Sequence, residues 1–157
     1  MPVLICLLEV ITVSAVNPNW NKTITLFNCL KGADNPSGTG DVWYKTVIPD
    51  CYFKCVTKQV NSGFNTQMAG AYTVRIPGSI TYLPYLSWVA LSAATRSQYF
   101  TIRNDDIVIL GSSAEVVSNV SPNTAAHVLA RNKPNAFKVT AASDNTSIFP
   151  PQYRLGG

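Results

Sequence analysis

The sequence predicts a mainly β protein, a single-domain β-barrel or β-sandwich with one or two short helices. Three observations lead to this fold class. The unbroken apolar run Ile107–Leu110 follows the turn residues Asn104-Asp105, which is typical of a buried strand. Lys22–Leu30 alternates polar and apolar residues with the period of a half-buried strand. The 157 residues are 46% hydrophobic and only 13% charged, a composition that suits one β-rich domain working inside an assembly.

A hairpin at residues 99–111 is the expected centre of the fold. Tyr99–Arg103 and Asp106–Leu110 are rich in β-forming residues, and Asn and Asp at positions 104 and 105 tolerate the positive φ of a tight turn. Because the second strand is apolar without interruption, we expect both of its faces to be covered. A strand covered on both faces is expected at the centre of a sheet or barrel.

The other elements follow from short apolar runs separated by turn residues. Pro49-Asp50 predicts a turn, and the polar stretches 31–40 and 61–70 are interpreted as loops. Pro84 and Ser121-Pro122 are typical of helix starts, which predicts short helices at 85–94 and 123–131. Strands are expected at residues 22–30, 41–48, 51–60, 71–76, 114–120 and 136–142.

The expected organisation is an apolar N-terminal arm or extension at 1–21, a β domain at 22–143 and an extended C-terminal tail at 144–157. Met1–Val16 is apolar, but no Lys or Arg precedes the apolar run and Glu9 interrupts it, unlike a typical signal peptide. It is also too short for a transmembrane helix. Three interpretations stay open: a cleaved signal peptide, a buried strand or arm, and an extension lying against a neighbouring subunit.

No residue pattern indicates catalysis or a cofactor, so we expect no enzyme. His127 is the only histidine and falls within a predicted helix, where a packing or surface role is usual. Asp105-Asp106 is the only acidic pair, and a turn followed by a strand entry accounts for it. The formal net charge is +4 with Lys and Arg scattered along the chain, so no basic run predicts a dedicated nucleic-acid site.

Four cysteines occur, at positions 6, 29, 51 and 55. Cys51 and Cys55 have no Cys or His partner pair nearby, so no zinc site is expected. Within a strand the two would point to the same side but lie too far apart for a disulfide. Free buried thiols are therefore expected.

Several stretches, taken in order, resemble a family of small tailed-bacteriophage head and neck virion proteins. They are Thr23–Asn28, Val42–Ile48, Tyr72–Pro77, Phe100–Gly111 and Pro151–Gly157, with Pro84, Trp88 and Lys138-Val139 between them. The chain departs from the family pattern at Asp105, where Gly is usual. Met1–Val16 has no counterpart in the family.

The resemblance implies a non-enzymatic structural protein of β-barrel or β-sandwich fold. It would form a ring homo-oligomer in the head–tail neck, as a connector, stopper, head-completion or minor capsid protein. DNA would pass through the ring without sequence-specific binding, and the partners would be other neck, portal-adaptor or tail proteins. The implied location is the virion, assembled in the host bacterial cytoplasm, with no membrane contact.

A ring subunit needs loops and termini that meet its neighbours, and two segments are the candidates. The candidate intersubunit contacts are Asn61, Ser62, Gly63, Phe64, Asn65, Thr66, Gln67 and Met68 in a loop, and Tyr153, Arg154 and Leu155 in the tail. Deleting residues 62–69 is expected to leave the monomer folded and to impair ring or virion assembly.

An alternative function comes from a different class. The chain would be a secreted, disulfide-stabilised β-sandwich binding module, for example for carbohydrate. Exposed Trp20 and Trp43 would then stack on sugar rings.

Overall fold

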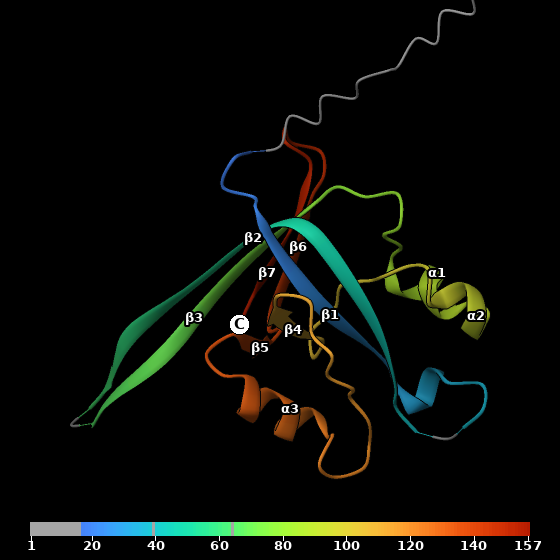
Figure 1. Ribbon diagram of the computed structural model, residues 1–157, viewed down its shortest axis with the longest axis horizontal. Coiled ribbons are helices and arrows are strands. Elements are labelled where there is room, and N and C mark those ends of the chain that lie inside the picture. The colour runs from blue at the N-terminus through green and yellow to red at the C-terminus, as the bar shows by residue number, and fades with distance from the viewer. Residues whose placement is uncertain (1–16, 39, 64) are drawn as a thin grey trace, which may run out of the picture.

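The structure is a computed structural model that describes residues 17–38, 40–63 and 65–157. It has the predicted mainly β fold, a curled antiparallel sheet of seven strands with three short α-helices (Figure 1). The strand order is β5-β4-β1-β2-β3-β7-β6. The elements are β1 Lys22–Leu30, the 3-10 helix η1 Gly32–Asp34, β2 Val42–Ser62, β3 Asn65–Pro77, α1 Tyr85–Val89, α2 Ala93–Arg96, β4 Ile107–Leu110, α3 Ala125–Asn132, β5 Ala136–Lys138, β6 Ala141–Asn145 and β7 Gln152–Gly156.

The long strand β2 divides the sheet into two halves. Its residues 42–51 pair with β1, and its residues 52–62 pair with β3. The predicted turn at Pro49-Asp50 is therefore wrong, because the chain bends within one strand there, with a positive φ of 56° at Asp50. We call β5, β4, β1 and residues 42–51 the β1 half, and residues 52–62, β3, β7 and β6 the β3 half.

The two edge strands of the sheet are almost continuous in the chain, so the sheet curls on itself. Only Val139 and Thr140 separate β5 from β6. The backbone N–H of Val139 donates to Asp106 O at 2.8 Å, and that of Thr140 donates to Gly156 O at 2.9 Å. These bonds tie the linking residues to both halves, which wraps the sheet around one interior as in a barrel.

Two groups of buried residues fill the fold. The inner core lies inside the curl and comprises Ile24, Leu26, Ile48, Cys51, Val74, Ile76, Phe100, Val108, Phe137, Val139, Tyr153 and Leu155. The outer core lies between the β1 half and α3 and comprises Phe27, Ile107, Ile109, Val117, Val128 and Ala136. Strand β4 contributes Val108 to the inner core and Ile107 and Ile109 to the outer one, so the prediction that both its faces are covered is confirmed.

The central position of β4 and its pairing with residues 99–103 were predicted wrongly. Strand β4 is second from the edge of the sheet, not at its centre. Residues 99–103 do not pair with it, and Phe100 makes only a single bridge, to Tyr82. The turn before β4 is present, with a positive φ of 78° at Asp105. The expected strand at 114–120 is also absent, since Val117 there fills the outer core and Asn119 Nδ2 donates to Asp41 O at 2.8 Å instead.

The helices differ from the prediction in detail. One helix was expected at 85–94, and the structure has two short ones, α1 and α2, with Ser92 as the N-cap of the second. Helix α3 begins after Thr124, whose hydroxyl accepts from the backbone N–H of His127, and Val128 packs it onto the outer core. Within the described part of the chain, no helix is long and apolar enough to cross a membrane.

Candidate functional site: a projecting β-hairpin arm

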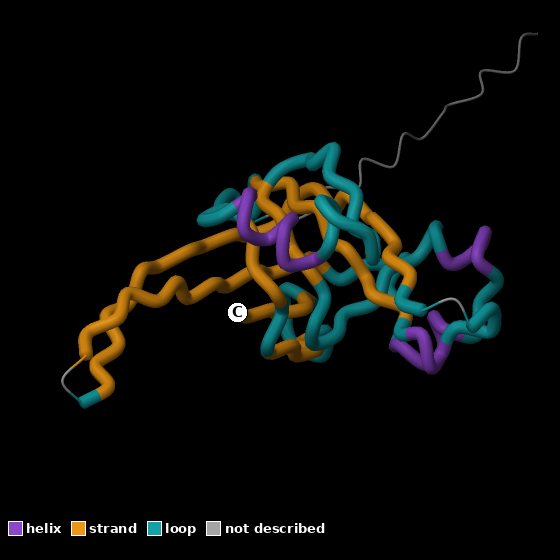
Figure 2. The backbone as a smooth tube through the Cα atoms, turned by 90° about the horizontal axis from the view of Figure 1, so that it is seen from below, coloured by secondary structure: helices purple, strands orange, loops and turns teal. Residues whose placement is uncertain are grey.

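Strands β2 and β3 continue beyond the body of the molecule as a two-stranded arm. Their register runs through eleven pairs, from Tyr52↔Arg75 to Ser62↔Asn65. Strand β7 pairs with β3 only from Thr73 to Pro77, so eight of the eleven pairs (11 − 3) have no third strand. We call residues 55–72 the arm, and both views show it projecting away from the body (Figures 1 and 2). At about 3.4 Å per residue, eight pairs extend about 27 Å.

The first five residues of the arm on β2 are not covered by the body. Residues 55–59 are all exposed, which means that side chains on both faces of the ribbon meet solvent. A two-stranded hairpin alone is only marginally stable in water. The outer edges of both strands also carry unpaired backbone donors and acceptors, which are a template for another strand. This geometry suits a segment that is completed by a neighbouring molecule.

The base of the arm is fixed firmly to the body. The ring of Tyr72 stacks on Phe137 with centroids 4.7 Å apart and an interplanar angle of 11°. The backbone N–H of Tyr72 donates to Gly157 O at 2.9 Å. Burial raises the pKa of Tyr72, and a hydrogen bond with the facing Cys55 acts in the same direction. The arm is therefore a rigid extension of the sheet at its root.

The tip of the arm carries the predicted contact segment. The stretch 61–70 was expected to be a loop, but it forms strand on both sides of a tight turn, with a positive φ of 61° at Gly63. Phe64 lies outside the described residues. The backbone of Asn61 and Ser62 pairs with that of Thr66 and Asn65. Backbone pairing places Gln67 and Met68 next along β3, opposite residues 60 and 59.

The predicted tail contacts are placed differently. Residues 144–157 do not form a separate tail, since β7 lies in the sheet between β3 and β6. Tyr153 and Leu155 belong to the inner core, so the expectation that they meet a neighbour is wrong. Only Arg154 of the three points outward and is exposed, because side chains alternate along the strand. The apolar side chains of Tyr153 and Leu155 pack in the core, and the sequence alone does not distinguish such residues from apolar contact residues on the surface.

Comparison with known proteins places the chain in a family. Residues 19–157 match the model of a family of unknown function, DUF6751. The chain belongs to this family. Comparison with curated proteins and with solved structures found no match. The part that matches DUF6751 includes the whole arm and the whole sheet.

The cysteine and histidine side chains of the DUF6751 region differ in their exposure to solvent. Burial raises the pKa of the Cys29 and Cys51 thiols to about 12, which keeps them protonated. Both are free and buried as predicted, whereas Cys55 is free but exposed on the arm, and Cys6 lies outside the described residues. His127 is exposed on α3, with its Nδ1 2.8 Å from Thr124 Oγ1. No group of three or more metal-ligating side chains occurs among residues 17–38, 40–63 and 65–157.

Among the described carboxyl groups, Asp106 has a strongly raised pKa. It is 1% exposed and accepts three hydrogen bonds, from Asn28 Nδ2 at 2.9 Å, Cys29 N at 3.0 Å and Arg103 N at 2.9 Å. Burial raises its pKa to about 7, and the three N–H donors act in the opposite direction. A pKa near 7 suits a general base, but a buried side chain does not reach a substrate. Asp106 instead ties β1 to the turn before β4, a role that the prediction of a strand-entry residue did not include.

The features that the secreted binding module needs are not found among the described residues. Trp20 is buried, and Trp43 packs against the outer core, so the expectation of two exposed sugar-stacking tryptophans is wrong. Cys29, Cys51 and Cys55 form no disulfide. The N-terminal segment 1–16, on which secretion would depend, lies outside the described residues.

Proposed function

We propose that this chain is a non-enzymatic structural subunit that assembles into a ring through its β2–β3 arm, within the head–tail neck of a tailed-phage virion. The observation that carries the proposal is the arm, which extends eight residue pairs past its last strand neighbour. The order of sequence stretches that resemble phage neck proteins supports the phage setting, and DNA then passes through the ring.

The arm offers a neighbour two kinds of contact. Its free strand edges present backbone N–H and C=O groups that another copy's strand would complete, as in β-strand addition. Its exposed side chains are mostly uncharged, for example Val56, Thr57 and Gln59, and they lose little solvation when an interface covers them. A protein with so few charges and such an arm is suited to fixed contacts within an assembly.

The root of the arm suits the same role. Because Tyr72 is held by Phe137 and Gly157, the arm keeps one direction relative to the body. A fixed direction fixes the rotation between neighbouring copies, and a head-to-tail contact closes into a ring when that rotation repeats to a full turn. Portal-adaptor or tail proteins would meet the remaining faces of such a ring.

An arm-shortened variant tests the proposal. Deleting 62–69 alone would join Asn61 to Gly70, whose native partners are Thr66 and Thr57, and would break the register. Removing residues 57–70 and joining Val56 to Ala71 through Asn-Gly keeps the facing pair Val56↔Ala71 and supplies a two-residue hairpin turn. We expect wild-type rings in sedimentation velocity and negative-stain micrographs, and a folded monomer for the variant.

Val116→Ser is the matched control, because it removes an exposed apolar side chain from a body loop and leaves the arm intact. It should assemble like the wild type. A wild-type protein that stays monomeric at its highest soluble concentration would contradict the proposal. Normal infectious particles from a phage that carries the shortened arm would contradict it as well.

A further inference from the structure

Two arginines face each other on the outer side of the β3 half. Arg75 of β3 and Arg154 of β7 are directly opposite in the antiparallel register. Their neighbours in sequence, Val74 and Leu155, lie in the inner core, so both arginines point away from the core. Directly opposite side chains share one face at Cβ separations of about 4.5–5.5 Å. The two arginine side chains thus leave the sheet from adjacent positions on the same outer face.

No acidic side chain neutralises this pair. Among the described residues, neither guanidinium has a carboxylate oxygen within 4.0 Å. Asp50 precedes Tyr52 by two residues on β2 and makes no ion pair with either arginine. Arg75 lies 5.7 Å from the Tyr52 ring centroid. Ion pairs elsewhere join Lys31 to Asp41, Arg103 to Asp34, Arg131 to Glu115 and Lys138 to Asp105.

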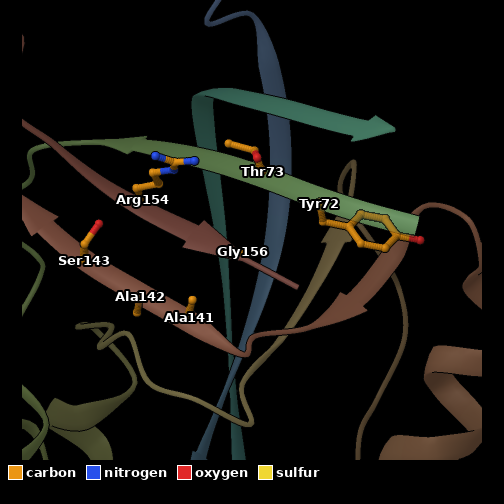
Figure 3. A pocket seen from close by; sticks show the side chains of 7 residues that line it. All are labelled: Tyr72, Thr73, Ala141, Ala142, Ser143, Arg154 and Gly156. Atoms are coloured by element: carbon orange, nitrogen blue, oxygen red, sulfur yellow. The ribbon is translucent and has the colours of Figure 1, made fainter. Parts of the chain in front are cut away.

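Neutral hydrogen-bonding groups lie beside Arg154. Figure 3 shows Arg154 extending from β7 toward β3, beside Thr73, with Ser143 on the neighbouring strand β6. These residues line a shallow hollow of about 280 Å³. Arginine with serine, threonine and tyrosine hydroxyls is the set of side chains that contacts phosphate groups of nucleic acids. The small hollow suits a group such as a phosphate, while the open face leaves room for the chain that carries it.

The cationic face continues onto the arm. Lys54 is opposite Thr73 and therefore shares the face of Arg75. Lys58 lies four residues further along β2 on the same side of the strand, and both lysines are exposed. At about 3.4 Å per residue, the track from the arginine pair to Lys58 is about 20 Å long. A line of cations of this length fits an extended polyanion better than a compact ligand.

We infer that this outer face, centred on Arg75 and Arg154, binds the phosphodiester backbone of a nucleic acid without reading its sequence. Each guanidinium presents a fork of N–H donors that matches two phosphate oxygens. The flat sheet face offers no element that enters a groove to read base edges. The inference deepens the proposed function, from which it takes DNA as the nucleic acid, and it adds the face of the subunit that meets the DNA.

Fluorescence anisotropy with labelled DNA tests this inference on the full-length protein. The probes are a mixed-sequence duplex and an oligo-dT strand, titrated over a range of salt concentrations. The variant Arg75→Gln with Arg154→Gln should bind the duplex about tenfold or more weakly, and its plot of log affinity against log salt should be shallower by about 1.8. Arg75→Lys with Arg154→Lys should keep the slope but bind less tightly, because lysine lacks the fork.

The matched control removes the same charge from two exposed lysines that lie away from this face, one on the β1 half and one at the end of α3. Lys45→Gln with Lys133→Gln changes the net charge equally and should leave affinity and slope close to wild type. An equal loss in this control would overturn the inference, since binding would then follow net charge alone. So would the absence of wild-type binding at low salt, or competition by polyglutamate as effective as that of unlabelled DNA.

Sedimentation of the same samples separates this inference from the ring proposal. Wild-type protein that binds DNA as a monomer would support the face and contradict the ring. Rings that bind no DNA would overturn the inference about the DNA-binding face and leave the ring proposal standing.

Discussion

The two halves of the sheet differ in what covers their outer faces. On the β1 half, α3 and the loop 112–123 cover the sheet, and Phe27, Ile107 and Ile109 are buried beneath them. On the β3 half, the equivalent face carries Arg75, Arg154 and Thr73 and has no layer over it. Both halves share the inner core on their other side. The outer face of the β1 half is therefore part of a hydrophobic core, whereas the outer face of the β3 half is free to contact another molecule.

A buried hydrogen-bond network further distinguishes the β1 half. The β1 half holds the Asp106 network, in which Asn28 Nδ2 also donates to Thr101 O at 2.6 Å. These hydrogen bonds hold residues 101–106 against β1, because this segment does not pair with β1 as a strand. The β3 half ends instead in the arm, where the paired backbones of β2 and β3 join the two strands. The Asp106 network therefore belongs to the β1 half, while the facing arginine pair and the free strand edges of the arm belong to the β3 half.

The largest expected effect comes from emptying the covered face. Phe27→Ala removes a side chain that is 2% exposed between β1 and α3, and it should lower the free energy of unfolding by about 3–5 kcal/mol. Urea unfolding followed by tryptophan fluorescence measures the change. Thr73→Ala on the bare face is the control and should change stability by less than about 0.5 kcal/mol. Equal losses at the two sites would remove the distinction between the halves.

A smaller effect is expected from the titration of Asp106. Its pKa in the folded protein is raised to about 7 from an ordinary value of 3.8, so the folded state keeps a proton that the unfolded chain has lost. The stability contributed by this group is complete below pH 3.8 and is lost as the pH rises through about 7. The free energy of unfolding should therefore fall by about 2–3 kcal/mol between about pH 5 and pH 7.

Asp106→Asn isolates this contribution, because an amide does not titrate. The variant should be less stable at about pH 5, since the Asn amide group faces the N–H donors that bound the carboxyl, and its stability should change less between pH 5 and 7. Glu115, whose pKa Arg131 lowers to about 2, affects the region below pH 4.5 and so leaves this window unchanged. Identical pH slopes for the two proteins would show that Asp106 does not titrate in this range.

The sequence predicted the covered half better than the open one, and the reason is physical. Burial on both faces left an unbroken apolar run at Ile107–Leu110, and this strand and the one at Lys22–Leu30 are both present. The prediction that Lys22–Leu30 is half-buried is wrong, because the polar Thr25 and Asn28 are buried and hydrogen-bonded. Of β2 and β3, which form the arm, residues 51–60 and 71–76 were predicted as strands, but the polar stretch 61–70 carries no apolar period and was interpreted as a loop. Residues 99–103 have strand-forming side chains but bond to Asn28 and Asp106 instead of to a strand.

The cationic face was also beyond sequence reasoning. Arg75 and Arg154 are 79 positions apart (154 − 75), and only the pairing of β3 with β7 brings them together. The sequence therefore has no run of basic residues at these positions, although the fold places Lys54 on the same face. A charge pattern that forms across two strands depends on their pairing register. A single sequence does not specify this register when the two strands are far apart in the chain.

The smallest expected effect is a gain in stability on the bare face. Arg154→Gln removes one of two like charges that face each other across strands, so the free energy of unfolding should rise by about 0.2–1 kcal/mol at low salt. The gain should disappear at high salt because ions screen the repulsion. Arg75→Gln should gain less, since it also loses the contact with the Tyr52 ring. Thermal unfolding at two salt concentrations measures both. A salt-independent loss in Arg154→Gln would mean that Arg154 stabilises the fold, and the two outer faces would then not differ as described.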